Sequence, residues 1–301
     1  FEGNHIPLFW AVEAVLLLWL FQKSKINSFK GGAIVVQVLA VISLLIDWMR
    51  YVYSEDLSIV LNPLFVAGLV VVASLFLTHK LLQKETSITE SNRIKKPKAH
   101  QTIVLIAAIL VAYFTGILEI HHQANQLISN SASAFSLSIT YHFVFISFLL
   151  YSSQVLKKEK TTKTVMIVGI VSVFFYLIQF YDLPSREIVE NFVETTNIQF
   201  AFIFHYLILG CLVYFGIQFY RKTNLLFNTK PQHIKLLPWL FVFAVVFVLS
   251  NEIMVHSMYF LNSVDTAELS IRFPSSLENM YDKNNFVNNQ VGIAKTQIVK
   301  I

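Results

Sequence analysis

Residues 102–120 read TIVLIAAILVAYFTGILEI, a run of nineteen residues in which Glu119 is the only charged side chain. A helix of about 20 mostly apolar residues crosses the roughly 30 Å hydrocarbon core of a bilayer. The sequence contains eight runs of this kind: Ile6–Phe21, Gly32–Met49, Leu61–Leu77, Thr102–Ile120, Ala134–Leu156, Thr164–Tyr181, Phe200–Tyr220 and Leu236–Phe260. Strands of membrane barrels alternate over about ten residues. These longer, continuous runs therefore predict an all-α, polytopic transmembrane helix bundle with about eight spans.

The composition supports a membrane protein and excludes several other classes. Hydrophobic residues make up 55% and charged residues 14% of the chain, whereas soluble domains carry about 25% charged residues. The mean hydropathy is +0.59. A chain with this few charged residues cannot cover a globule with polar surface, which excludes a soluble enzyme. The same composition excludes a disordered chain. A single cysteine, Cys211, excludes an internal disulfide and a cysteine-based metal cluster.

The positions of Lys and Arg predict the orientation in the membrane. The first, third, fifth and seventh loops between the spans hold 17 of the 23 basic residues. Cytoplasmic loops carry an excess of Lys and Arg, so we expect these loops in the cytoplasm and both Phe1 and the tail of the chain outside it. The net charge of +5 then lies along the inner leaflet. The expected partner is the lipid bilayer, and no nucleic acid is expected.

The sequence predicts two regions. Residues 1–261 form the transmembrane helical bundle, and residues 262–301 form an extracytoplasmic polar tail leading toward a further span. The tail is rich in Asn and poorly patterned, which argues against a separate domain. The apolar start and the character of residues 291–301 predict that the chain is a fragment of a longer protein.

Residues 185–194 predict a short amphipathic helix on the outer surface of the membrane. In helical spacing, four apolar residues share one face and three glutamates take the other, while Ser185 is suited to cap the first turn. The apolar residues are Ile188, Val189, Phe192 and Val193, and the glutamates are Glu187, Glu190 and Glu194.

The spans pair into four helical hairpins with a recurring acidic residue. The second helix of each hairpin carries one near its outer end: Asp47, Glu119, Asp182 and Glu252, at spacings of 72, 63 and 70 residues. An acid at a helix C-terminus opposes the macrodipole by roughly 0.3–1 kcal/mol. Its recurrence there predicts a helical-hairpin repeat with a common partner for the carboxylates.

Six ionisable residues are candidates for a ligand-binding site. Such residues within spans are costly and usually face a bundle interior or a wet cavity. They are Glu13, Glu119, His142, His205, Glu252 and His256, placed from the middle of the membrane outward. The chain has no nucleotide-binding or hydrolase motif, and we expect no cofactor. Tyr and Trp near helix ends, such as Tyr51, are interpreted as interfacial anchors.

Three interpretations of the six residues remain open. The first is an outward-facing polar pocket, because Glu and His exchange protons near neutral pH once burial shifts them. The second is a zinc site, although its ligands would come from four helices and match no known ligand string, and we expect no metal. Its ligands would be Glu119, His122, His142, His205, Glu252 and His256. The third is interhelical hydrogen bonding, worth about 0.6 kcal/mol per bond.

Three short motifs carry a family resemblance. Residues 10–20, WAVEAVLLLWL, together with Asp47, residues 61–65, LNPLF, and residues 249–252, LSNE, resemble the W-x-x-E-A-x-x-L-L-W-L, L-N-x-x-F and S-x-E elements of a family of large multi-pass bacterial inner-membrane proteins known only as a domain of unknown function. The chain departs from that pattern in the fifth span, at Thr140, Tyr141 and His142. The resemblance implies an envelope location and a bundle built from repeats, and it supplies no activity.

We therefore expect an inner-membrane protein of the bacterial envelope that binds or moves a small polar or lipid-linked molecule through a polar pocket in the outer leaflet. One alternative is a membrane-embedded transferase acting on a lipid-linked donor, with a loop carboxylate as base. Its loop candidates are Glu55, Asp56, Asp265, Glu268, Glu278 and Asp282. Another alternative is a structural scaffold that contacts other envelope proteins through the tail and residues 185–194.

Overall fold

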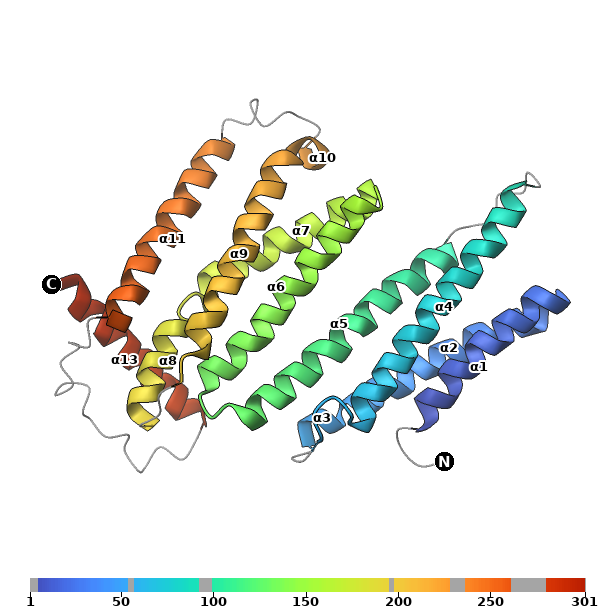
Figure 1. The fold of residues 1–301 in the computed structure, drawn as a ribbon, viewed down its shortest axis with the longest axis horizontal. Coiled ribbons are helices and arrows are strands. Elements are labelled where there is room, and N and C mark those ends of the chain that lie inside the picture. Colours follow the sequence, from blue (N-terminus) through green and yellow to red (C-terminus); the bar gives the residue numbers. More distant parts are fainter. Residues whose placement is uncertain are drawn as a thin grey trace. The chain divides into compact units, whose positions relative to one another are not determined.

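The computed structural model describes residues 5–53, 57–91, 99–194, 198–227, 236–260 and 280–300, and helix is the regular secondary structure throughout these ranges (Figure 1). Eight helical stretches within them are long and apolar enough to cross a membrane. This confirms the predicted all-α, polytopic architecture. The helices are α1 (His5–Ser24), α2 (Asn27–Trp48), α3 (Arg50–Tyr53), α4 (Pro63–Ser91), α5 (Ala99–Leu127), α6 (Ser131–Val155), α7 (Glu159–Phe175), the π-helical turn η1 (Tyr176–Phe180), α8 (Leu183–Glu194), α9 (Phe200–Arg221), α10 (Thr223–Phe227), α11 (Leu236–Phe260) and α13 (Met280–Lys300).

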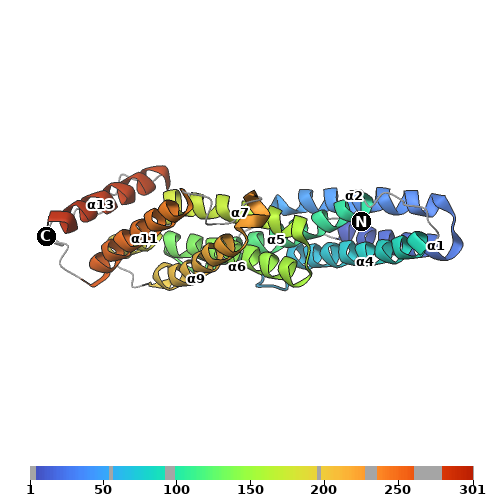
Figure 2. The ribbon, with the colours of Figure 1, turned by 90° about the horizontal axis from the view of Figure 1, so that it is seen from above.

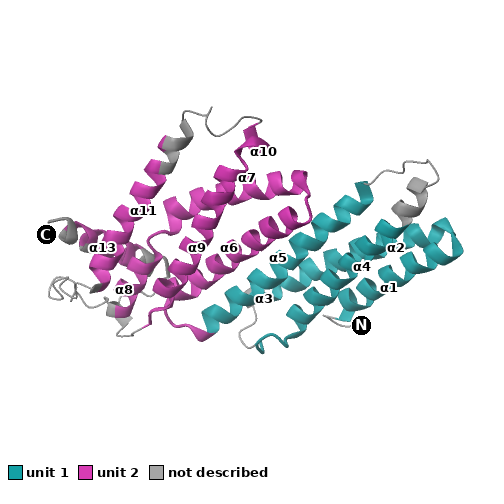
Figure 3. Cartoon of the chain, turned by 45° about the horizontal axis from the view of Figure 1, so that its top comes forward, with its two compact units in different colours: residues 1–126 teal, residues 127–301 magenta. Residues whose placement is uncertain are grey.

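The chain forms two compact units, residues 1–126 and residues 127–301 (Figure 3). Unit 1 holds the first two predicted hairpins, α1 with α2 and α4 with α5, and unit 2 holds the other two. The predicted boundary between bundle and tail, at residue 261, lies outside the described residues.

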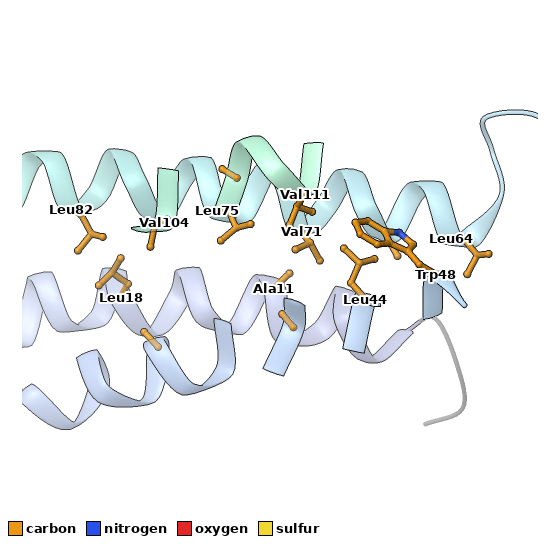
Figure 4. Close-up of a cluster of buried hydrophobic side chains, with 14 of the residues drawn as sticks. Ala11, Leu18, Leu44, Trp48, Leu64, Val71, Leu75, Leu82, Val104 and Val111 are labelled. Atoms are coloured by element: carbon orange, nitrogen blue, oxygen red, sulfur yellow. The ribbon is translucent and has the colours of Figure 1, made fainter. Parts of the chain in front are cut away.

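Small residues let the helices of unit 1 approach closely. Helices α1, α2 and α4 pack side by side (Figures 1 and 2), and Ala11, Ala40 and Ala67 at their interfaces are fully buried. In membranes, small residues allow the close backbone approach on which helix association depends. Larger side chains fill the remaining core, among them Leu18, Leu44, Val71, Leu75, Val104 and Val111 (Figure 4).

The outward faces of the spans are also apolar. Val35, Ile46, Phe148 and Val213 are each more than half exposed. A soluble monomer rarely exposes a contiguous apolar surface of this extent, whereas lipid is a suitable solvent for it. The surface and the length of the helices together define a multi-pass membrane protein.

Unit 2 is built around α6, which packs against α7, α8 and α9. Its core includes Phe143, Leu150, Met166, Tyr176 and Ile208. Helices α7 and α9 meet closely at Gly169, where a Cβ atom would lie 2.5 Å from the ring of Phe215.

The helix predicted at residues 185–194 is present as α8, but its glutamates do not form an outward polar face. Glu187 and Glu190 are only 1% and 3% exposed because both carboxylates turn into unit 2, where they bind the first turns of α6 and α9. The side chains of residues 192–194 lie outside the described residues. Sequence periodicity cannot distinguish a solvated acidic face from one that caps neighbouring helices.

The tail contributes the helix α13, which packs on α8 and α11 through Val287 and Val291. Lys295 on α13 lies 2.5 Å from Asp182, between the Nζ and Oδ1 atoms. The stretch predicted to lead toward a further span is therefore a polar helix attached to unit 2.

Candidate functional site

Three of the six predicted site residues meet in unit 2, where α9 and α11 face the end of η1. His205 on α9 places its Nε2 atom 2.6 Å from Oε1 of Glu252 on α11. The hydroxyl of Tyr181 donates to the same oxygen over 2.5 Å. One turn along α11, Nδ1 of His256 lies 3.6 Å from Oε2 of Glu252. We call His205, Glu252 and His256, with Tyr176, Tyr181 and Tyr206, the Glu252 cluster.

Hydrogen bonds run through the Glu252 cluster from the interior of unit 2 to its surface. Tyr176, on the inner side, lies 2.7 Å from Nδ1 of His205 through its hydroxyl oxygen. On the outer side, His256 Nδ1 lies 2.7 Å from the backbone oxygen of Glu252, and the Tyr206 hydroxyl lies 2.6 Å from Nε2 of His256. The side chains of His205, Glu252 and His256 are 1%, 16% and 36% exposed, respectively, so the cluster opens gradually outward.

The donor and acceptor roles follow from the partners. Nδ1 of His256 faces a backbone carbonyl, so it carries the proton and Nε2 accepts from Tyr206. Nε2 of His205 donates to the Glu252 carboxylate, and Nδ1 accepts from Tyr176. Each imidazole thus has a hydrogen-bond partner at both ring nitrogens.

A π-helical turn brings the two inner tyrosines to the same side. Tyr176 and Tyr181 are five residues apart, which in a regular α-helix would separate their directions by about 140°. The turn η1 spans Tyr176–Phe180, and the two ring centroids lie 5.8 Å apart. Bulges of this kind occur frequently at functional sites. Nothing in the local sequence predicts η1, and the tyrosines were therefore missed.

One oxygen of Glu252 keeps its capacity to accept a hydrogen bond. Oε1 accepts hydrogen bonds from the Tyr181 hydroxyl and from Nε2 of His205. Among the described residues, Oε2 accepts no hydrogen bond, since Nδ1 of His256 lies 3.6 Å away and is committed to a backbone carbonyl. A carboxylate offers about four lone-pair positions. In Glu252, those on Oε2 accept no hydrogen bond from the described residues.

Both carboxylate oxygens of Glu119, in unit 1, accept hydrogen bonds from neighbouring residues of the same unit. It is 4% exposed, and four donors reach its carboxylate. Oε2 accepts from the Tyr51 hydroxyl at 2.9 Å and from Nδ2 of Asn62 at 2.6 Å, and Oε1 accepts from the Val60 amide at 3.0 Å and from Nε2 of Gln123 at 3.2 Å. Glu119 therefore holds residues 57–62, the segment before α4, against α5.

Tyr51 is part of this arrangement, and its interpretation as an interfacial anchor is wrong. The side chain is 8% exposed. Burial, and after it the Glu119 charge, raises the pKa of Tyr51 far above its usual range, so the phenol remains a donor. Asn62 also accepts from the Phe65 amide at 2.8 Å, which makes it the N-cap of α4 ahead of Pro63.

Glu187 and Glu190 on α8 are two further buried carboxylates in which both oxygens accept hydrogen bonds, and sequence reasoning missed their role. Glu187 accepts from the amides of Ala201 at 2.7 Å and Phe202 at 3.0 Å, in the first turn of α9, and from the Ser133 hydroxyl. Glu190 accepts from the Ala132 amide at 3.1 Å in the first turn of α6. Carboxylates stabilise helix N-termini by satisfying unpaired amides and by opposing the helix dipole.

The other predicted site residues have surroundings of their own within each unit. His142 is in unit 2, where its Nε2 atom lies 2.9 Å from the Ser172 hydroxyl on α7. Glu13 and Glu119 belong to unit 1, and Glu13 is half-buried on α1 without a hydrogen bond to another described residue. Within unit 2, the structure thus brings together three of the six predicted residues, His205, Glu252 and His256.

Two other expectations concern these carboxylates. The described residues contain no group of three or more His, Cys, Asp or Glu arranged to hold a metal ion. The loop carboxylates of the transferase alternative lie outside the described residues, except for Asp282, of which only the backbone is described.

The two units use their glutamates in a parallel way. Tyr51 follows the first hairpin of unit 1 and donates to Glu119 in the second, 68 positions later. Tyr181 follows the first hairpin of unit 2 and donates to Glu252 in the second, 71 positions later. A tyrosine is therefore a common partner for two of the four recurring acids, as a repeat would require. The other two differ: Asp182 pairs with Lys295, and Oδ2 of buried Asp47 has no partner among the described residues.

The fold and these sites define the class of the protein, a multi-pass helical membrane protein with buried carboxylates in each unit. No protein-family model matches the chain, and neither a curated protein nor a solved structure matches it. The function must therefore be argued from the Glu252 cluster itself.

Proposed function

We propose that this chain belongs to an inner-membrane protein of the bacterial envelope that binds or moves a small polar or lipid-linked molecule, with the Glu252 cluster as its binding site. The observation that carries the proposal is the unused Oε2 atom of Glu252, beside a carboxylate that is otherwise held rigidly by Tyr181 and His205. In the proposed orientation, the basic loops face the cytoplasm and the Glu252 cluster lies toward the outer leaflet.

The local chemistry supports binding of a hydrogen-bond donor. Tyr181 and His205 fix the position of Oε1, so Oε2 is presented in a defined direction. The His205 side chain is buried and that of Glu252 is mostly buried, and a charge-assisted hydrogen bond in such surroundings is stronger than one in water. A ligand that carries an ammonium or hydroxyl group would donate the missing hydrogen bond to Oε2 of Glu252. Both oxygens of the carboxylate would then have donors, as both oxygens of Glu119 have in unit 1.

Replacing Glu252 by glutamine tests the proposal while preserving the fold. The glutamine oxygen takes the place of Oε1 and keeps the bonds from Tyr181 and His205, whereas the NH₂ group replaces the acceptor at Oε2. Since a hydrogen bond to a charged group contributes about 1.5–3 kcal/mol, ligand affinity is expected to fall by about tenfold or more. The measurement is growth under detergent stress in cells that lack the native gene and express each variant at equal level.

Glu13→Gln is the matched control because Glu13 is also a half-buried acid within a span, but in the other unit. We expect Glu13→Gln to restore growth and Glu252→Gln to fail. Full restoration by Glu252→Gln would refute the proposed function.

A further inference from the structure

A long apolar groove lies in unit 2 between α7 with η1, α9 and α11. Its volume is about 560 Å³, and fourteen residues line it. Every lining residue is apolar or glycine. Val173 and Leu177 form one wall, Leu209 belongs to the second, and Val245 and Val248 belong to the third.

The groove exists because α11 is attached to the rest of unit 2 mainly near one end. Helix α11 packs on α8 and α13, and Glu252 bonds to Tyr181 and His205 at the same end. Toward residue 244, the lining of α11 faces Gly216 and its neighbours on α9. Glycine contributes no side chain, which leaves space between the helices.

The Glu252 cluster lies within about one helical turn of the groove lining on all three walls. Leu177 directly follows Tyr176, Leu209 lies one turn from His205, and Val248 lies one turn from Glu252. From Leu209 to Phe219 the groove follows α9 for about 15 Å, at about 1.5 Å per residue. The Glu252 carboxylate therefore lies about one turn beyond the lining of an apolar groove that runs along the spans. Its Oε1 atom is bonded to Tyr181 beside Val248, and its Oε2 atom lies on the side of His256.

We propose that the groove holds the hydrocarbon chain of an amphiphilic molecule whose headgroup donates a hydrogen bond to Oε2 of Glu252. This inference rests on the proposed function and names its ligand class, a lipid-linked molecule with an N–H or O–H donor beside the chain. The charge of Glu252 further favours an ammonium group. The headgroup of this molecule lies at the polar Glu252 cluster, and its hydrocarbon chain lies in the apolar groove.

Two probes separate headgroup recognition from simple contact with lipid. The purified chain is placed in nanodiscs that contain a small fraction of phosphatidylethanolamine with a photoreactive acyl chain, or of phosphatidylcholine with the same chain. Both headgroups carry a positive nitrogen, but only ethanolamine has N–H donors. We expect the ethanolamine probe to label groove residues about tenfold more than the choline probe, the ratio given by one hydrogen bond to a charged group.

Val245→Phe and Val246→Phe form a matched pair for the chain. The two valines are adjacent on α11 and 53% and 56% exposed, but only Val245 lines the groove. Val245→Phe is expected to reduce labelling of the groove by about fivefold or more, a change equivalent to about 1 kcal/mol, and Val246→Phe to leave it unchanged. In Glu252→Gln the preference for ethanolamine is expected to disappear.

Equal labelling by the two probes in the unaltered chain, or an equal effect of the two valine variants, would overturn this inference. Absence of groove labelling would also overturn it, since another helix or a second copy would then fill the groove. Growth of the variants under detergent stress distinguishes failure of the groove inference from failure of the proposed function. If Val245→Phe restores growth and Glu252→Gln does not, the groove inference fails and the proposed function stands. If Glu252→Gln restores growth, the proposed function itself fails.

Discussion

Replacing Glu187 by alanine is expected to lower the free energy of unfolding of unit 2 by about 2–6 kcal/mol, because two backbone donors lose their acceptor together. The carboxylate accepts from the Ala201 and Phe202 amides and from Ser133. Without it, two backbone donors at the start of α9 are buried and unpaired, which costs about 1–3 kcal/mol each. Helix α8 also loses one of its polar connections to α6, through Ser133, and its bonds to the first turn of α9, whereas the bonds of Glu190 to α6 remain.

The effect of Glu187→Ala can be measured by heating the protein in detergent and by hydrogen exchange at Ala201 and Phe202. Glu159→Ala is the control because Glu159 is an exposed acid in the first turn of α7. Glu187→Gln should have an intermediate effect, since the amide keeps one acceptor oxygen. Equal stability of the Glu187→Ala and Glu159→Ala variants would show that the caps contribute nothing.

Glu119→Ala is expected to destabilise unit 1 by about 2–4 kcal/mol, because several buried donors lose their acceptor together. The Val60 amide has no other recorded acceptor, while Asn62 and Gln123 retain weaker bonds to the backbone of residues 57 and 58. The loss should be localised to the segment before α4.

Hydrogen exchange over residues 57–65 measures this local effect directly. We expect faster exchange there in Glu119→Ala than in Glu13→Ala, since Glu13 makes no hydrogen bond with another described residue. Unchanged protection at Val60 would contradict the role given to Glu119.

The spans could be predicted from the sequence because lipid demands long apolar helices, and each predicted run overlaps one of the eight helical stretches. The pairing of Glu252 with His256 could be expected from their spacing of four residues on α11. The positions of the recurring acids also pointed to real features, since Glu119 and Glu252 each bind a tyrosine of the preceding hairpin.

The partners of the buried acids could not be predicted because they come from other helices. Glu187 fits an amphipathic pattern equally well whether its face meets water or the first turn of α9. Tyr181 and Tyr176 share a side only because of η1, which has no local sequence signal. Tyr51 near a helix end is typical of an interfacial anchor, and only the fold reveals its bond to Glu119.

Carboxyl labelling measures whether Glu252 retains an oxygen for a ligand while both oxygens of Glu119 and of Glu187 are occupied by hydrogen bonds. Native membranes are treated with dicyclohexylcarbodiimide, an apolar carboxyl reagent, and peptides are analysed by mass spectrometry, with Glu13 as the accessible reference. The account predicts that Glu252 is labelled and that Glu119 and Glu187 are not. Labelling of Glu119 or Glu187 with Glu252 unmodified would contradict it.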